Sequence, residues 1–305
     1  MITLAIVLAV LGAALSAVGV QLQAAGVRDE SRDDRLRLRG IRRLLSNPKW
    51  LLGLTVLSVC AGLQILALAL APVTVVAPIV VLALPVIVVL NARATGARLD
   101  LRTSTAVVAS TGGVAVFVGL AASVVSPVAF DENAVVRAGQ YVALAVVVLG
   151  LIGAVRHGIT RCLALAAGTG AAYGLVSVLV RDVTFTFRHG GITAVSPLSA
   201  AGLVIAFTAG SWFLQLAYAS GPPDLVVGCQ TVLSPLVATG LGIGVLDETV
   251  NAGGWRGIGM IVAGVVAIAG VAVLARHHRP RAAQVLVGQE PGGEAGTSTS
   301  ASSVR

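Results

Sequence analysis

The sequence predicts an all-α polytopic membrane protein with nine transmembrane helices, arranged as two inverted four-helix repeats plus a linking helix. Of its 305 residues, 56% are hydrophobic and 11% are charged, and the mean hydropathy is +0.94. Soluble globular chains carry roughly 25% charged residues, so this chain has too few to cover a soluble surface. Its apolar residues also lie in runs long enough to cross a bilayer. We therefore expect one membrane domain over residues 1–274 and no separate soluble domain.

The second observation is an internal repeat. Two segments, Gln64–Pro78 and Gln215–Gln230, each begin as a helix, meet a proline and continue as a second apolar run. A shift of 151 residues (215 − 64) places Gln64 on Gln215, Pro72 on Pro223 and Gly113-Val114 on Gly264-Val265. One shift that serves several helices indicates an internal duplication, and matched broken helices are typical of duplicated transporters. We expect repeat one over residues 1–124 and repeat two over residues 162–274.

In the first repeat, charged segments separate four apolar runs. We expect Met1–Ala25 to be a retained first span rather than a signal peptide, because its arginines follow the apolar run instead of preceding it. Residues 26–49 form a basic cytoplasmic loop, in which Asn47-Pro48 is a start signal for the next helix. The remaining spans are Leu51–Leu70, Thr74–Val89 and Thr105–Val124, with a tight hairpin at Ala71–Val73 and a basic loop at Asn91–Arg102.

The second repeat follows a linking helix. Residues 141–155 have no counterpart under the shift and join the two repeats. After a tight basic loop at Arg156–Arg161, the spans are Cys162–Val180, Leu198–Tyr218, Leu225–Leu246 and Gly257–Leu274, with loops at Arg181–Pro197 and Asp247–Arg256 and a turn at Ala219–Asp224. Residues 275–305 begin basic and become rich in Gly, Ser and Thr, so we expect a disordered cytoplasmic tail.

The distribution of positive charge sets the expected orientation. With residues 26–49 inside, alternation through nine spans leaves four of the 21 lysines and arginines outside, at Arg137, Arg181, Arg188 and Arg256, and 17 (21 − 4) inside. The positive-inside rule then places the N-terminus outside and the C-terminus in the cytoplasm of a cell membrane. The two repeats begin five spans apart, an odd number, so they run in opposite directions.

The net charge of +8 reflects this topology rather than nucleic-acid binding. For the segment that carries Arg35, Arg39, Arg42 and Arg43 we expect a solvated loop that fixes the orientation, with these arginines near anionic membrane lipids, and a short interfacial helix is the alternative. The sequence leaves open whether the protein forms a homodimer.

Patterns for catalysis and metal binding are missing from the apolar runs. No Ser/His/Asp set, metal-ligand cluster or phosphate-binding loop occurs within a predicted span. Cys60, Cys162 and Cys229 each lie inside an apolar run, at spacings that exclude a disulfide framework and a zinc site. The acidic residues of the predicted spans and later loops lie at helix ends or in loops, at Asp100, Asp131, Glu132, Asp182, Asp224, Asp247 and Glu248. We expect no enzyme, no cofactor and no metal site.

Neutral polar residues are then the candidates for a substrate site. Thr208, Ser211, Trp212, Gln215 and Tyr218 recur at helical spacing, and such a face should meet protein or a cavity rather than lipid. The alternative is ordinary hydrogen bonding between helices, with Tyr218 as an anchor at the membrane interface. The candidate substrate-binding residues are Gln64, Gln215, Trp212, Ser211, Tyr173, Ser177 and Gln230, and the candidate helix-breaking residues are Pro72, Pro78, Pro223 and Pro235.

Several short motifs resemble the drug/metabolite transporter superfamily and, within it, the NIPA-type magnesium transporter branch. They are Ala69-Leu70-Ala71-Pro72, Val76-Ala77-Pro78, Arg156-His157-Gly158, Gly170–Ser177 and Asp247-Glu248, in the family's order over most of residues 1–274. The resemblance implies a fold of inverted repeats and magnesium as the substrate. Where the NIPA pattern has Gly-Glu in the second span, this chain has Gly62-Leu63, and the missing glutamate would be a natural magnesium ligand.

The sequence therefore predicts an integral membrane transporter that moves a small metabolite or drug-like solute by alternating access. The expected substrate is neutral or amphipathic and is held by amide, hydroxyl and aromatic groups. The alternatives are a NIPA-like magnesium transporter and a non-transporting membrane scaffold or lipid-binding protein.

Overall fold

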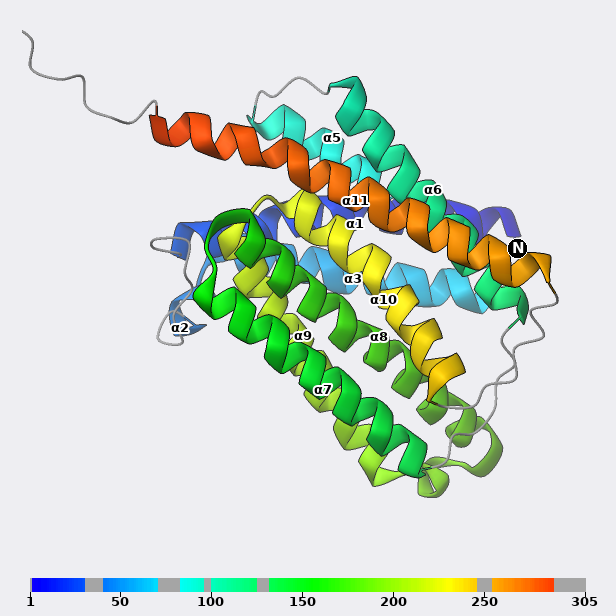
Figure 1. Ribbon diagram of the computed structural model, residues 1–305. Helices are drawn as coiled ribbons and strands as arrows, with labels where there is room; N and C mark the ends of the chain where they lie inside the picture. Colours follow the sequence, from blue (N-terminus) through cyan, green and yellow to red (C-terminus); the bar gives the residue numbers. More distant parts are fainter. Residues whose placement is uncertain are drawn as a thin grey trace, which may run out of the picture.

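The computed structural model describes residues 2–30, 41–70, 83–95, 100–124, 132–245 and 254–287, and in these ranges the chain forms helices and no strand. The predicted all-α class is confirmed. Figure 1 shows long helices packed side by side, with their ends gathered at two ends of the molecule. The elements are α1 (Ile2–Glu30), α2 (Ile41–Leu44), α3 (Pro48–Leu70), α5 (Ala83–Thr95), α6 (Leu101–Val124), α7 (Glu132–Val155), α8 (Gly158–Gly190), η2 (Ile192–Ala194), α9 (Pro197–Ser220), α10 (Pro223–Gly244) and α11 (Trp255–Val287).

Seven of these helices, α1 and α6 to α11, are long and apolar enough to cross a membrane. The chain is therefore a multi-pass membrane protein. Helix α3 has 23 residues and covers the second predicted span, whereas α5 has 13 residues and covers the end of the third. Neither is among the seven found within the described ranges, and residues 71–82 lie outside those ranges. The count of nine spans stays a prediction.

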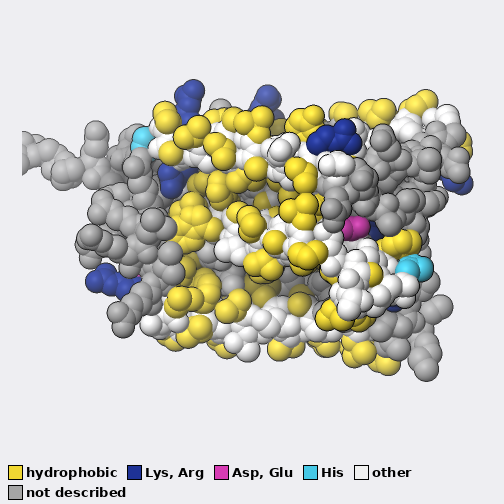
Figure 2. All heavy atoms as spheres, turned by 90° about the horizontal axis from the view of Figure 1, so that it is seen from below, with side chains coloured by type: hydrophobic (Ala, Val, Ile, Leu, Met, Phe, Trp, Pro, Cys, Tyr) yellow, Lys and Arg dark blue, Asp and Glu magenta, His cyan; other side chains and the backbone are white. Residues whose placement is uncertain are grey.

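Hydrophobic side chains cover much of the described face seen in Figure 2, and few charged side chains lie among them. Helix α7 is typical of this surface, because Leu144 is 64% exposed and Leu151 is 61% exposed. In water, such a surface would drive aggregation, but in a bilayer it meets lipid of equal polarity.

Several helices extend beyond the predicted spans, so the predicted boundaries are wrong at these places. Helix α1 continues to Glu30, inside the predicted loop at 26–49, and α7 begins at Glu132 rather than Tyr141. Helix α8 continues to Gly190 rather than Val180, and α11 runs to Val287 through the start of the predicted disordered tail. Hydropathy marks only the apolar part of a helix, because Arg, Glu and Gln are also good helix formers and extend it into the polar zone.

The start of α3 agrees with its sequence signal. The Asn47 side-chain Oδ1 accepts hydrogen bonds from the backbone N–H groups of Lys49, at 3.0 Å, and Trp50, at 3.2 Å. Pro48 occupies the first helical position, where its missing N–H has no intrahelical partner to lose. The prediction that Asn47-Pro48 begins a helix is confirmed. Helix α8 ends equally clearly, at Gly191 with a φ of 73°.

Two helix pairs depend on small residues at their contacts. Gly12, Gly19 and Gly26 of α1 recur every seven residues, and a Cβ added at each would lie 3.5, 2.7 and 2.7 Å from atoms of α3. A Cβ on Gly113 of α6 would lie 2.8 Å from the backbone of α11. Close backbone approach of this kind is the usual way in which membrane helices associate, since burial of apolar surface drives little association in lipid.

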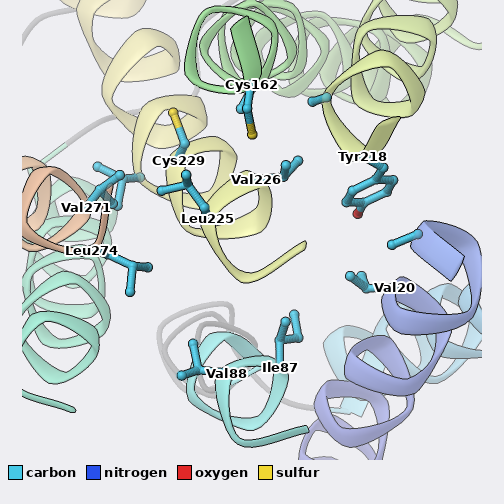
Figure 3. Close-up of a cluster of buried hydrophobic side chains, with 14 of the residues drawn as sticks. Val20, Ile87, Val88, Cys162, Tyr218, Leu225, Val226, Cys229, Val271 and Leu274 are labelled. Atoms are coloured by element: carbon cyan, nitrogen blue, oxygen red, sulfur yellow. The ribbon is translucent and has the colours of Figure 1, made fainter. Parts of the chain in front are cut away.

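The main buried cluster lies where the two halves of the chain meet. It contains side chains of both halves, and those labelled in Figure 3 are Val20, Ile87, Val88, Cys162, Tyr218, Leu225, Val226, Cys229, Val271 and Leu274. A second cluster joins α7 to α8, α9 and α10. We call the end of the molecule at which α1 ends and α8 and α10 begin the α2 end, because α2 lies there (Figure 1).

Candidate functional site

Helices α8 and α9 are antiparallel and are joined by polar bonds at three depths. At the α2 end, Arg161 Nε donates to Ser220 Oγ at 2.9 Å. In the middle, the hydroxyls of Tyr173 and Ser211 lie 3.1 Å apart. At the far end, Ser199 Oγ donates to Asp182 Oδ2 at 2.8 Å. The outer two bonds are 21 residues apart on α8 (182 − 161), about 32 Å along the helix.

This spacing explains how two charged side chains are buried in an apolar helix pair. Arg161 is 8% exposed and Asp182 is 7% exposed. A hydrocarbon core is about 30 Å thick, so side chains about 32 Å apart lie near its two edges. Each has a hydrogen-bond partner there, and Arg161 also donates from Nη1 to the Gly153 carbonyl oxygen at 2.6 Å. Both charged side chains thereby lie near the edges of the hydrocarbon core, where the free-energy cost of placing a charge in the membrane is smallest.

Both residues lie in predicted loops, Arg156–Arg161 and Arg181–Pro197, and that prediction is wrong. Arg161 lies in the first turn of α8, and Asp182 lies eight residues before its last residue, Gly190. The partner of Asp182 is 17 residues away in the chain, on α9. The hydropathy of the residues around Asp182 cannot predict a hydrogen-bond partner that lies on another helix.

Of the hydroxyls predicted along α8, only that of Tyr173 bonds to another helix. Ser177 is exposed, and its Oγ donates to the Tyr173 carbonyl oxygen of the same helix at 2.9 Å. Thr169 is fully buried and likewise bonds to the Leu165 carbonyl oxygen. The structure therefore brings Tyr173 and Ser211 together and leaves Ser177 apart.

Gln215 joins the two halves of the chain. Its Oε1 accepts a hydrogen bond from Nε1 of Trp50 on α3 at 3.2 Å, and both side chains are less than a tenth exposed. Trp50 is not among the predicted site residues, and its position carries no clear signal, since a tryptophan at the start of a span is also a common interfacial anchor. Next to them Tyr218 is 1% exposed, so it is no interfacial anchor, and its ring faces Val20 across the cluster in Figure 3. Trp212 packs against the same cluster and is half-buried.

Further polar groups gather around this junction at the α2 end. Gln21 Nε2 donates to the Ile87 carbonyl oxygen at 3.4 Å, which ties α1 to α5. Gln23 is 4% exposed and lies against Gly53 of α3. Asp224, in the first turn of α10, is 3% exposed and interacts electrostatically with Arg28 of α1. The half-to-half junction at this end is therefore polar and closely packed.

Gln64 lies far from Gln215, although the repeat pairs them. Its Nε2 donates to Cys60 Sγ at 3.4 Å, and Cys60 in turn donates to the Gly12 carbonyl oxygen at 3.0 Å. Gln64 is 14 residues from Trp50 on the same helix (64 − 50), about 21 Å along α3. The two glutamines therefore lie at different depths and do not share one contact.

The remaining predicted residues lie on α10 or outside the described ranges. The backbone of Gln230 lies against Gly170 of α8, and Pro235 lies inside α10. Pro223 is at the first position of α10, directly after the break at Gly221-Pro222. Pro72, Pro78, Arg35 and Arg39 lie outside the described residues, as does the side chain of Arg42, whereas Arg43 is exposed on α2.

Comparisons with known proteins give one relative and no family. The chain is 27% identical over 250 residues to an uncharacterised protein of Corynebacterium glutamicum, a match that covers 80% of this chain and 85% of that protein. No protein-family model matches the sequence. No solved structure matches it either. A related chain of similar length therefore exists in Corynebacterium glutamicum.

Proposed function

We propose that this protein is a transporter that moves a small neutral or amphipathic solute across a membrane by alternating access between two inverted halves. The observation that carries the proposal is the contact between α6 and α11. These are the last helices of the two proposed repeats, and they pack closely against each other. Inverted halves of this kind are typical of secondary transporters, whose substrate sites lie between them.

The contact between α6 and α11 is centred on residues that the 151-residue shift pairs. A Cβ on Gly113 would meet Ala263 and Ala267, which lie on either side of Gly264, the residue that the shift assigns to Gly113. A Cβ on Gly270, further along α11, would meet Ser110, which is nearer the start of α6. The two helices are therefore antiparallel. Two equivalent helices that cross head to tail at equivalent residues are what an inverted two-fold relation requires.

Other helix contacts support the same relation. In the first half, α1 packs against α3 and α5, and in the second half the corresponding α8 packs against α9 and α10. The pairs α1–α3 and α8–α9 are both antiparallel, as judged from the residues that their glycines contact. The equivalent helices α5 and α10 also touch each other across the junction.

The uncharged polar groups at the junction and between α8 and α9 favour a solute without fixed charge. Trp50 and Gln215 offer an indole N–H and an amide, and Tyr173 and Ser211 offer hydroxyls. The buried charges of Arg161 and Asp182 lie at the two ends and already bond to protein groups, and the buried Asp224 at the junction interacts with Arg28. Such a donor set suits hydroxyl, carbonyl or aromatic groups on the solute.

Magnesium, implied by the family resemblance, is the second substrate class for the experiment to test. The NIPA pattern has a glutamate in the second span as a natural magnesium ligand. This chain has Leu63 at that position, and Leu63 lies near Gly12 of α1. Within the described parts of the chain, no group of three or more His, Cys, Asp or Glu side chains could hold a metal ion. We therefore rank an organic solute first.

The test is flux into liposomes that contain the purified full-length protein. A thermal-shift screen of small metabolites and drug-like compounds supplies candidates, and a trapped magnesium indicator runs in parallel. We expect saturable uptake of an organic solute, lowered several-fold by Gln215→Ala and by Gln64→Ala. Ser58→Ala is the matched control, because Ser58 is exposed on α3 and bonds only to its own helix at Leu54. Saturable magnesium flux would select the second substrate class, and no flux of any solute by folded protein would refute transport.

We also propose that the α2 end faces the cytoplasm and contacts anionic lipid. Arg43 is exposed there, and Lys49, six residues further along the chain (49 − 43), forms an exposed ion pair with Asp29 at 2.8 Å. Arginines 35, 39 and 42 belong to the same segment. Labelling of a cysteine introduced at position 43 by a membrane-impermeant reagent in intact cells would overturn this orientation.

A further inference from the structure

Helix α6 carries a buried hydroxyl without a hydrogen bond. Thr111 is 8% exposed, and its Oγ1 has no hydrogen-bond partner among the residues that the structure describes. Its chain neighbour Ser110 is also buried, but Ser110 Oγ donates to the Val107 carbonyl oxygen at 3.1 Å. A buried hydroxyl without a partner destabilises a fold, so proteins rarely keep one unless another group bonds to it. A ligand that bonds to Thr111 would remove this cost.

The Thr111 side chain faces the junction between the halves. Val107 lies four residues before it and Val114 three residues after it, so the three side chains share one face of α6. Val107 and Val114 belong to the main buried cluster, whose members come from both halves. Gly113, which contacts α11, lies about 200° around α6 from Thr111, so this face points away from α11.

Helix α10 offers a backbone oxygen that lacks its usual partner. Pro235 lies inside α10 and has no N–H, so the carbonyl oxygen of Thr231, four residues earlier, loses its bond within the helix. Leu233, which lies against Gly170 of α8, is about 200° around α10 from Thr231. The Thr231 carbonyl and hydroxyl therefore lie on the side of α10 away from α8. On its other sides α10 contacts α5 and α6 of the first half.

Helices α6 and α10 run in the same direction, because both are antiparallel to α11. The glycine contacts described above show this for α6. For α10, a Cβ on Gly264 of α11 would lie 3.0 Å from Leu236. Leu225, near the start of α10, instead lies beside Val271, which is further along α11 (Figure 3).

Thr111 and Thr231 lie at almost the same depth. The Cβ on Gly264 that would contact Leu236 of α10 would also lie 3.7 Å from Phe117 of α6. Thr111 is six residues before Phe117 (117 − 111), and Thr231 is five residues before Leu236 (236 − 231). The depths of the two threonines therefore differ by about 1.5 Å.

This depth is near the middle of the membrane. Gln230, the residue before Thr231, lies against Gly170 of α8. Gly170 is nine residues from Arg161 (170 − 161) and twelve from Asp182 (182 − 170), about 14 and 18 Å along the helix. Those two charged side chains lie near the edges of the hydrocarbon core. A polar group without a partner is most costly between them.

We propose that Thr111 and Thr231 bind a hydrogen-bond-donating group of the transported solute between α6 and α10, near the middle of the membrane. This assignment rests on the proposed transporter. The Thr231 carbonyl oxygen can only accept a hydrogen bond, whereas each threonine hydroxyl can donate and accept. The solute therefore carries a hydroxyl or an amide N–H, and the apolar cluster around the two threonines suits an apolar remainder. Three uncharged oxygens are too few for the octahedral shell of Mg²⁺.

The first experiment measures thermal unfolding of the full-length protein without added solute. Thr111→Val keeps the shape of the side chain and removes the hydroxyl that has no partner, so the melting temperature should rise by about 2–4 °C. Pro235→Ala restores an N–H for the Thr231 carbonyl oxygen and should also raise it. Ser110→Ala is the matched control, because it removes a buried hydroxyl that is already bonded, and it should give no rise. A melting temperature of Thr111→Val at or below that of the unmodified protein would overturn the inference.

The second experiment compares paired solutes by the shift in melting temperature that they cause. Nicotinamide is paired with N,N-dimethylnicotinamide, and benzyl alcohol with benzyl methyl ether, so that methylation removes the donor in each pair. We expect the donor of at least one pair to stabilise the protein and its methylated partner not to. Thr111→Val should lower the affinity for that donor about tenfold, whereas Thr111→Ser and Ser110→Ala should retain it.

Several outcomes of the second experiment would overturn the inference. Equal stabilisation by both members of each pair would mean that no donor is recognised, and stabilisation by neither donor would mean that the two threonines bind only water. Uptake into liposomes separates this site from the proposed function. Binding that Thr111→Val weakens, without uptake of any solute, refutes transport alone. Uptake that Thr111→Val and Pro235→Ala leave unchanged refutes the site alone.

Discussion

The contact between α6 and α11 can be tested with two neighbouring glycines. Gly112 and Gly113 lie side by side in the middle of α6. A Cβ on Gly113 would lie 2.8 Å from the Ala263 carbonyl oxygen and 2.8 Å from the Ala267 backbone nitrogen, whereas a Cβ on Gly112 would meet nothing within 4 Å. The two Gly→Ala changes are chemically identical and differ only in what the added methyl group contacts.

The magnitude follows from that geometry. Nonbonded carbon contacts are most favourable at about 3.5–4.0 Å, so Gly113→Ala requires α6 and α11 to separate by roughly 1 Å. Overpacking of this kind costs about 1–3 kcal/mol. Both substitutions gain helix propensity, about 1 kcal/mol in water, and this gain cancels in the comparison. The free energy of unfolding of Gly113→Ala should therefore be about 1–3 kcal/mol lower than that of Gly112→Ala.

A thiol-reactive maleimide dye reports this unfolding directly, because the chain has three buried free cysteines, at Cys60, Cys162 and Cys229. The dye becomes fluorescent as heating exposes them, and a detergent titration followed by circular dichroism gives the free energies. Equal stability of the two variants, or greater stability of Gly113→Ala, would refute the close backbone contact. It would also remove the support that this contact gives to the inverted repeat.

Three further predictions follow from single hydrogen bonds. In a double-mutant cycle, Trp50→Phe and Gln215→Leu should show a coupling energy of about 0.6–1.7 kcal/mol in the unfolding titration, and additive effects would mean that the bond does not form. Ser199→Ala removes a hydroxyl donor from the buried Asp182 carboxylate, so it should cost about 1.5–3 kcal/mol in the same titration; an unchanged midpoint would contradict the bond. Asn47→Ala removes the N-cap of α3 and should cost about 0.5–2 kcal/mol, whereas Asn47→Asp should retain most of the stability.

The sequence was sufficient to predict a helix end where the end is set by interactions between residues close together in the chain. Asn47-Pro48 begins α3 because an amide side chain can bond to the next backbone N–H groups in any context. The break before α10 lies at Gly221-Pro222, inside the turn predicted at Ala219–Asp224. In both places the interaction spans only a few residues, so the sequence pattern contains it.

The candidate site could be predicted only in part. Polar residues at helical spacing on α9 identified Gln215 and Ser211 as inward-facing, and both bond to other helices. The pattern could not separate them from Ser177, whose hydroxyl bonds to its own helix. Nor could it select Trp50, whose partner lies 165 residues away. Spacing along one helix gives the direction of a side chain but not what lies in that direction.

The sequence by itself determined that this is a helical multi-pass membrane protein, because the cost of placing polar side chains in lipid acts on each residue separately and is summed along the chain. It also determined which residues the 151-residue shift pairs. Only the tertiary structure decided that Arg161 and Asp182 are buried with partners, and that Trp50 of α3 bonds to Gln215 of α9. Those outcomes depend on groups far apart in the chain, and their distances are set when the helices pack.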